Sequence, residues 1–165
     1  MKRWYFQIKK VCNRIVFTPG YNNFKHWFLI DIKLDFLIHY NRGKLGETIN
    51  CKISKFEPIL TRNINKNTGK FIWSVFEEHG KYKKIELIHP CPKNPLLWNW
   101  IIKNLKPKSV IDPFLGSGTT AEVCTKLGIK WLGYEINEVY SQDINKRLKN
   151  SKKEPQQIDL KNYII

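Results

Sequence analysis

The sequence predicts an α/β protein organised around one parallel βαβ unit between residues 109 and 135. Three observations predict this unit: an apolar stretch that ends in an acidic residue, a turn with two glycines, and a second apolar stretch after a short amphipathic segment. The segments are a strand at 110–112, the turn at 116–118, a helix at 119–127 closed by Gly128, and a strand at 130–134.

The glycine turn has the features of a ligand-binding loop. Gly116 and Gly118 lack a Cβ, so the backbone there can approach a ligand closely, and the following helix directs its free N–H groups at the same place. Glu135 follows Asp112 by 23 residues, close to the spacing of about 20 at which such folds bind a ribose. Two carboxylates disfavour a phosphate, and they suit a cationic ligand with a ribose. S-adenosylmethionine (SAM) is such a ligand.

Three sequence segments together resemble the C-terminal half of the amino-group DNA methyltransferases, which methylate adenine N6 or cytosine N4. The segments are Asp-Pro-Phe-Leu-Gly-Ser-Gly-Thr-Thr at 112–120, Gly-Tyr-Glu-Ile-Asn at 133–137 and His-Pro-Cys-Pro-Lys-Asn-Pro at 89–95. Their order resembles the β-type permutation of that family, and the resemblance extends over about 89–148 and, more weakly, over 14–60. It implies a Rossmann-like, SAM-dependent methyltransferase fold, with SAM as cofactor and DNA as substrate.

Roles for the site residues follow from charge and from this resemblance. Asp112 is expected to face the ammonium group of SAM, and Glu135 to accept from both ribose hydroxyls. The Thr119 hydroxyl and the helix N-terminus are expected to receive the SAM carboxylate. The methionine pocket is expected to be shaped by Phe114, Gly116, Ser117 and Gly118, and the resemblance adds His89 and Lys93 on the cofactor side. A dinucleotide site is disfavoured because no third glycine follows at the required offset.

The N-terminal half is expected to supply the rest of a partial methyltransferase domain, residues 1–149. A helix at 2–12 should bury Trp4, Ile8 and Val11, and a strand should follow at 14–18. The dense aromatic and aliphatic residues of 21–40 favour core packing over base stacking. The segment 41–55 is predicted to be a loop, and 56–60 a strand that resembles the family's Glu-Pro-Ile-Leu segment.

Two further segments are predicted to be basic surface. Residues 61–80, which include Arg62, Lys66 and Lys70, are either a cationic loop facing DNA or an ordinary solvated connection. Towards the C-terminus, helices are predicted through 96–102 and over 138–148. The remaining residues, 150–165, are predicted to form a basic surface tail.

The family's catalytic Asp/Ser-Pro-Pro-Tyr motif is absent from this sequence, so no catalytic residue is expected in it. In the family, the strand leading to that motif lies between the strands that correspond to 110–112 and 14–18. We therefore expect an incomplete sheet with a central strand missing, and a second polypeptide that supplies strand and motif. Two alternatives remain: a non-catalytic remnant that binds SAM or nucleic acid, and a methyltransferase acting on RNA or a small molecule.

Composition indicates a globular protein with a polyanionic partner. The chain has 165 residues, 42% hydrophobic and 13% aromatic, with 29 basic against 14 acidic residues and a net charge of +15. A/T-rich codon usage can explain part of the lysine, but it also enriches glutamate, so DNA remains the expected partner. The four cysteines lack zinc-ligand spacing and are expected to be reduced. Neither metal nor membrane association is expected, which predicts a cytoplasmic protein.

Overall fold

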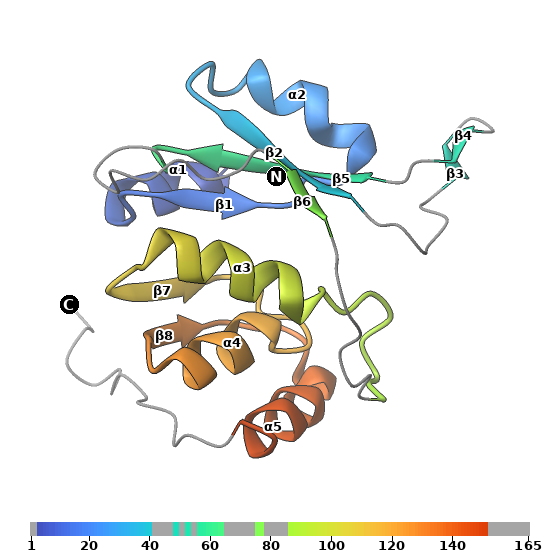
Figure 1. The fold of residues 1–165 in the computed structure, drawn as a ribbon, viewed down its shortest axis with the longest axis vertical. Coiled ribbons are helices and arrows are strands. Elements are labelled where there is room, and N and C mark those ends of the chain that lie inside the picture. The colour runs from blue at the N-terminus through green and yellow to red at the C-terminus, as the bar shows by residue number, and fades with distance from the viewer. Residues whose placement is uncertain are drawn as a thin grey trace. The chain divides into compact units, whose positions relative to one another are not determined.

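A computed structural model describes residues 3–40, 48–49, 52–53, 56–64, 75–77 and 86–151 of the chain. By internal contacts the chain divides into two compact units, Met1–His79 and Gly80–Ile165. The ribbon in Figure 1 shows a mixed sheet with two helices in the first unit and a βαβ unit with two flanking helices in the second. The predicted tail lies outside the described residues beyond Ser151.

The first unit is built on a four-stranded sheet in the order β1-β5-β2-β6. Strands β1 and β2 pair antiparallel with β5, and β6 pairs parallel with β2. The elements are α1 (Arg3–Val11), β1 (Ile15–Phe17), η1 (Tyr21–Asn23), α2 (Phe24–Phe28), β2 (Asp35–Tyr40), β3 (Thr48–Ile49), β4 (Lys52–Ile53), β5 (Phe56–Arg62) and β6 (Val75–Glu77). The predicted helix at 2–12 and the strands at 14–18 and 56–60 are confirmed.

Strand β5 tolerates a proline although it lies between two neighbours. Strand β1 covers β5 only from Leu60 to Arg62, so within the described part of the chain Pro58 has a strand neighbour on one side only, where it lies opposite Ile38. A proline lacks the N–H that a strand needs when both sides are paired. Its position at the uncovered part of β5 therefore explains why the Glu-Pro-Ile-Leu segment can be a strand.

The core of the first unit is an aromatic cluster shared by the helices and the sheet. Tyr5 of α1, Trp27 of α2 and Leu60 of β5 are buried in it, and the Phe17 and Trp27 rings lie 4.7 Å apart, edge to face. The face predicted for α1 was partly wrong: Val11 is 71% exposed, and Tyr5 is the fully buried residue instead. The 21–40 segment contributes to the core as predicted.

A buried carboxylate connects the helices and sheet of this unit. Asp31 Oδ2 accepts from Tyr5 Oη, Lys9 Nζ and Arg62 Nε, each at 2.9 Å, and Asp31 Oδ1 accepts from Lys33 N at 3.0 Å. Arg62 was predicted to belong to a solvated basic loop, and this was wrong. It is the last residue of β5, and it pairs with the carboxylate that joins α1 to the sheet.

Two loop predictions fall mostly on residues that are not described. Within the predicted loop at 41–55, β3 and β4 form a short antiparallel hairpin. Within 61–80, residues 61 and 62 complete β5, and β6 follows at Val75–Glu77. Lys66 and Lys70 lie outside the described residues.

The second unit contains the predicted βαβ unit. Strands β7 (Ser109–Asp112) and β8 (Lys130–Gly133) pair in parallel, with Asp112 opposite Gly133, and α4 (Thr119–Leu127) connects them. Gly128 adopts a left-handed conformation at the end of α4, as predicted. The flanking elements are α3 (Pro95–Leu105), η2 (Glu138–Tyr140) and α5 (Ser141–Lys149).

Helices α3 and α4 pack together with the parallel strands. Their core contains Ile102, Val123 and Cys124, with Trp98 and Trp131 packed against it. Helix α3 starts at Pro95, and the Asn94 side chain caps it by accepting from Leu96 N at 2.9 Å. Asn94, which separates Lys93 from Pro95 in the sequence, therefore has a structural function of its own.

Each unit has a strand with one open side. Among the described residues, β1 pairs only with β5, and β7 pairs only with β8. An unpaired strand edge leaves backbone N–H and C=O groups without ladder partners. The expected missing strand stays a prediction.

Candidate functional site

The carboxyl ends of β7 and β8 form the framework of the candidate site. The strand ladder continues past both strands, because Tyr134 N donates to Asp112 O at 2.9 Å and Leu115 N donates to Tyr134 O at 2.8 Å. In open α/β sheets, ligands bind at this edge. The two predicted carboxylates, Asp112 and Glu135, thus extend from neighbouring strand ends on either side of the turn.

The turn itself requires its glycines. Gly116 and Gly118 have φ values of +54° and +83°, in the left-handed region that other residues rarely adopt. A Cβ at Gly118 would also lie 3.1 Å from the Cα of Ile144 in α5. Gly118 is the N-cap residue of α4, so the backbone that leads into the helix lies close to α5 without a side chain between them.

The Glu135 carboxylate holds the turn in place. Its Oε2 accepts from Gly116 N at 2.7 Å, and its Oε1 accepts from Asn137 N at 2.9 Å. Asp112 folds back in the same way, because its Oδ1 accepts from Phe114 N at 3.0 Å. A carboxylate has about four acceptor positions in all, so both groups keep capacity for further donors.

The segment that contains His89 lies against the turn. The imidazole of His89 packs on Tyr140 with ring centroids 4.5 Å apart, and its Nδ1 accepts from Cys91 N at 3.1 Å. A Cβ at Gly116 would lie 3.1 Å from Nε2 of His89. The structure therefore brings His89 to the glycine turn, and its expected place on the cofactor side stays a prediction.

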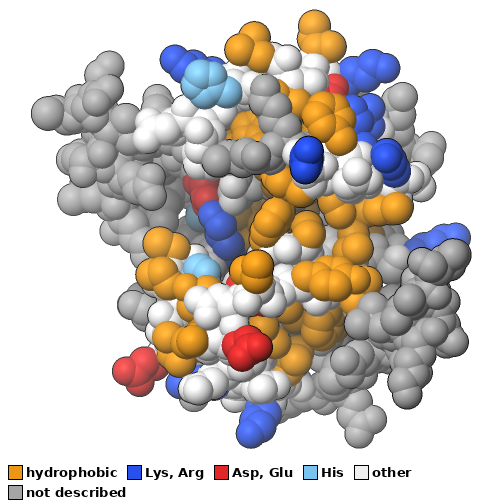
Figure 2. Space-filling model, turned by 180° about the vertical axis from the view of Figure 1, so that it is seen from behind, with side chains coloured by type: hydrophobic (Ala, Val, Ile, Leu, Met, Phe, Trp, Pro, Cys, Tyr) orange, Lys and Arg blue, Asp and Glu red, His pale blue; other side chains and the backbone are white. Residues whose placement is uncertain are grey.

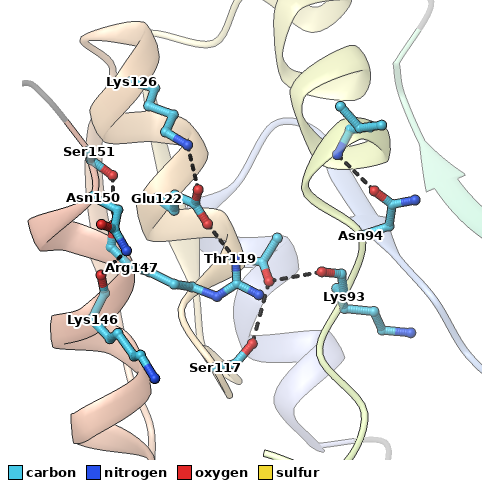
Figure 3. A network of polar contacts seen from close by, with 11 residues as sticks. Lys93, Asn94, Ser117, Thr119, Glu122, Lys126, Lys146, Arg147, Asn150 and Ser151 are labelled. Carbon is cyan, nitrogen blue, oxygen red and sulfur yellow. Dashed lines mark hydrogen bonds and ion pairs between the residues drawn. The ribbon is translucent and has the colours of Figure 1, made fainter. Parts of the chain in front are cut away.

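Lys93 reaches the site through its backbone. The Thr119 hydroxyl donates to the Lys93 carbonyl at 3.2 Å and lies 3.5 Å from the Ser117 hydroxyl (Figure 3). Thr119 and Ser117 are both buried. Because the Thr119 proton is committed to the Lys93 carbonyl, donation to a ligand at this end of the site falls to the backbone N–H groups at the start of α4.

Exposed apolar side chains border the same strand ends. Phe114, which follows β7, is 61% exposed, and Ile136, which follows β8, is 99% exposed. Tyr134 and Val139 are also about half exposed. Sequence reasoning named Phe114 and missed Ile136, although its position next to Glu135 in an apolar-acidic-apolar pattern was a usable signal.

A buried polar network behind the turn was not predicted. Figure 3 shows Arg147 of α5 directed at Glu122 of α4, which also pairs with Lys126 at 2.5 Å. Asp143, one turn before Arg147, is 2% exposed and accepts from Ile88 N and His89 N. Tyr140, Asp143, Ile144 and Arg147 follow a helical spacing of three and four residues, which places Asp143 and Arg147 on the inner face of α5. That spacing was the sequence signal from which the buried network could have been predicted.

Among the described residues, no group of three His, Cys, Asp or Glu side chains could hold a metal ion. The helices in the described ranges are all too short or too polar to cross a membrane. On the face seen in Figure 2, the Lys and Arg side chains of the described part are scattered among hydrophobic ones, so this view defines no single basic patch.

A parallel βαβ unit with a glycine turn between two acidic strand ends is the architecture of a Rossmann-like α/β protein. The model of the DNA methylase family matches residues 2–146, so the chain belongs to that family. It is similar to the type II methyltransferase M.HinfI of Haemophilus influenzae, with 39% identity over 67% of this chain and 33% of the relative. It is also 49% identical to the orphan methyltransferase M.BamHII of Bacillus amyloliquefaciens, over 48% of this chain and 31% of the relative.

The chain thus spans about a third of the length of these curated relatives. Among solved structures, it is similar to the M1.HpyAVI–SAM complex, with a TM-score of 0.65 and 23% identity over 88% of this chain and 80% of the other. It also resembles the cytosine-N4-specific PvuII DNA methyltransferase, with a TM-score of 0.60 and 16% identity over 96% and 72% of the two chains. The expected fold class and family are confirmed.

Proposed function

We propose that this chain is the SAM-binding part of a DNA methyltransferase that modifies adenine N6 or cytosine N4. In this proposal SAM binds at the glycine turn between Asp112 and Glu135, and the catalytic strand and loop come from a second polypeptide. The observation that carries the proposal is the pair of carboxylates on neighbouring strand ends, with the turn between them tied to Glu135.

The chemistry of this donor and acceptor set fits SAM better than it fits a phosphate ligand. Glu135 keeps acceptor capacity for two ribose hydroxyls after binding two backbone N–H groups. Asp112 offers a negative charge to an ammonium group, and the same charge repels a phosphate. The exposed Phe114 and Ile136 side chains offer apolar surface for an adenine ring and a methionine chain.

SAM supplies a methyl group bonded to a positively charged sulfur, and the target amine attacks the methyl carbon directly. The residues of this chain bind and orient that group. Glu135 holds the ribose and Asp112 the ammonium group, the turn from Gly116 to Gly118 allows close approach, and His89 with the Lys93 backbone lies on the methionine side. None of these side chains is proposed to accept the proton released by the amine.

A ligand-truncation titration tests the cofactor assignment. SAM and 5′-methylthioadenosine, which lacks the amino-acid part, are titrated calorimetrically against the wild type, Asp112→Asn and Glu135→Gln. Losing a charged hydrogen-bonding partner should weaken binding about ten- to a hundredfold. Glu135→Gln should weaken both ligands, whereas Asp112→Asn should weaken SAM only.

The matched control is Glu138→Gln. Glu138 is an exposed acidic residue of η2, so this substitution should change the affinity for neither ligand. NAD⁺ serves as the competing ligand, since a dinucleotide site is the main alternative for such a turn. Binding of NAD⁺ in preference to SAM, or an Asp112→Asn effect equal for both SAM and the truncated ligand, contradicts the assignment.

Two observations support completion by another polypeptide, and a third supports DNA as the substrate. The sequence contains no Asp/Ser-Pro-Pro-Tyr motif, so it lacks the loop that orients the target amine in the family. Among the described strands, β1 and β7 each keep one side open, as a supplied strand would require. The net charge of +15 provides the long-range attraction that a DNA substrate requires.

Reconstitution tests this part. The reading frames that flank the gene are translated in search of a strand followed by Asp/Ser/Asn-Pro-Pro-Tyr/Phe/Trp, and any such polypeptide is co-expressed with this chain. Transfer of tritiated methyl groups from SAM to DNA by the pair, and by neither alone, is the expected result. Methyl transfer by this chain alone contradicts the proposal, as does finding the motif in the same reading frame.

The non-catalytic alternative rests on the same missing motif. It predicts SAM or DNA binding without transfer, even with the flanking polypeptide present. The other alternative, a methyltransferase that acts on RNA, is tested by replacing DNA with RNA in the same assay. Methylation of RNA but not of DNA would show that RNA is the substrate.

A further inference from the structure

We propose that Asp143 is a positioning residue for the cofactor site and that it acts through His89. The inference rests on the proposed SAM site, and it adds a residue that lies outside the glycine turn and the His-Pro segment. Asp143 is on α5, 2% exposed, in a part of the sequence that otherwise reads as an ordinary amphipathic helix.

The first step is the contact that Asp143 makes. Its Oδ1 accepts from Ile88 N at 2.9 Å and its Oδ2 accepts from His89 N at 2.8 Å. Both carboxylate oxygens therefore bind consecutive backbone N–H groups of a segment more than 50 residues away in sequence. Residues 86–94 contain no helix or strand that could satisfy these N–H groups, so the side chain of α5 takes that function.

The second step is the direction that this anchor gives to His89. The His89 ring packs on Tyr140, which lies directly before α5. Its Nδ1 accepts from Cys91 N, so in the neutral imidazole the proton is on Nε2. Nε2 is the ring atom nearest to a Cβ built on Gly116, at 3.1 Å. The fixed backbone and fixed tautomer together present an N–H donor at the glycine turn.

Helix α5 also lies against Gly118, the other glycine of the turn. Ile144, the residue after Asp143, is the closest neighbour of a Cβ built on Gly118. One turn further along α5, Lys146 Nζ donates to Glu86 O at 2.7 Å and gives the segment a second, exposed attachment. Helix α5 therefore fixes the His89 segment and the glycine turn relative to each other, with Asp143 as the buried contact.

The test compares Asp143→Asn and Asp143→Ala with the wild-type chain. Asparagine keeps the volume but offers one acceptor, and its NH₂ faces the second backbone N–H. Amide hydrogen exchange by NMR should show faster exchange at Ile88 and His89, at one of them strongly in Asp143→Asn and at both in Asp143→Ala. The His89 ring signals should shift, and SAM affinity should fall about tenfold in Asp143→Asn.

A double-mutant cycle with His89→Ala separates positioning of His89 from general stabilisation of the fold. In a His89→Ala background, Asp143→Asn should cause no further loss of SAM affinity, because the residue through which it acts is gone. Gln142→Ala, an exposed neighbour on α5, is the matched control and should change none of these readouts. Unchanged exchange at Ile88 and His89, or equal losses of affinity with and without His89, would overturn the proposal.

The proposed function can fail independently of this inference. A wild-type chain that binds no SAM removes the proposed cofactor, while the exchange rates and His89 ring signals still decide whether Asp143 fixes the segment.

Discussion

The His89 ring lies close against the position that a Cβ at Gly116 would take. A Cβ at Gly116 would be 3.1 Å from Nε2 and 3.4 Å from Cδ2 of the imidazole, and the φ of Gly116 is +54°. Two separate reasons therefore require glycine at this position: the backbone conformation and the proximity of the ring. Gly20 has a similar φ of +73° with nothing within 4 Å, so it carries only the first of them.

Gly116→Ala should consequently be more harmful than Gly20→Ala. Both variants incur strain on the order of 1 kcal/mol from a left-handed alanine, but only Gly116→Ala also displaces the His89 ring. We expect a comparable loss of stability from the backbone in both, and a loss of SAM affinity in Gly116→Ala alone. Urea unfolding together with SAM titration measures the two effects, and equal SAM affinities in both variants would contradict this account.

The buried pair of Glu122 and Arg147 should be strongly coupled. Both side chains are at most 5% exposed. Glu122→Gln leaves the buried Arg147 charge without its carboxylate, at a cost of about 3–5 kcal/mol, whereas Arg147→Met leaves Glu122 with only the half-exposed Lys126 and should cost less. The double variant should cost much less than the two single variants added together. A double-mutant cycle from denaturant unfolding measures this, with Lys126→Met as the control that removes only the half-exposed partner of Glu122.

Additive single effects in that cycle would show that the pair contributes little in the folded state. Figure 3 indicates why we expect otherwise, since Glu122 lies between its two cationic partners at the junction of α4 and α5.

Asp31 should make the stability of the first unit depend on acid. Burial alone would raise the pKa of Asp31, but its four hydrogen-bond donors hold the pKa below the usual range. The folded state therefore binds fewer protons than the unfolded state below about pH 4, and stability is lost as the pH falls towards the folded pKa. Asp31→Asn should be destabilised at pH 7, and the difference from the wild type should shrink below pH 4.

Unfolding midpoints measured from pH 7 down to pH 2.5 give that comparison, with the exposed Asp35→Asn as control. A constant difference between Asp31→Asn and the wild type across this range would mean that the Asp31 charge does not contribute.

The pKa of Tyr5 moves in the opposite direction. Burial and the hydrogen bond to Asp31 raise the pKa of Tyr5, so its phenol should stay protonated beyond pH 10 in the folded chain.

The thiols should differ sharply in reactivity. Burial, together with the nearby charge of Asp112, raises the pKa of the Cys124 thiol to about 12, and the residue is fully buried. Cys91 is exposed in the His89 segment. A disulfide reagent at pH 8 should modify Cys91 rapidly and Cys124 only after unfolding. In a chain that also carries Cys12→Ser and Cys51→Ser, Cys91→Ser should remove the rapid phase, and rapid labelling of Cys124 in the folded chain would contradict this expectation.

Local signals explain which parts of the fold were predictable. The bounds of α4 and its Gly128 cap were predicted correctly because glycines, hydroxyl residues and the apolar period all lie within a few residues of one another. The resemblance to short family motifs singled out the segment that contains His89, which the structure places against the glycine turn. Both depend on neighbours in the sequence or on a pattern already known to fold in one way.

The unpredicted parts depend on contacts between distant segments. Helix α1 is short and apolar on more than one side. Tyr5, unlike Val11, is buried where its hydroxyl donates to Asp31, 26 residues away in the sequence. Asp143 binds a segment that lies 54 to 55 residues earlier. A charged residue on an amphipathic helix reads as surface until such a partner is known.

The packing of Gly133 against Leu115 has a consequence for how this sequence can vary. A Cβ at Gly133 would lie 2.7 Å from Cδ2 of Leu115, closer than real atoms approach, although the Gly133 backbone is that of an ordinary strand. A side chain at position 133 would therefore force the Leu115 side chain to move. Relatives that carry alanine at 133 should carry a smaller residue than leucine at 115, and the two substitutions should appear together across a deep alignment of homologues.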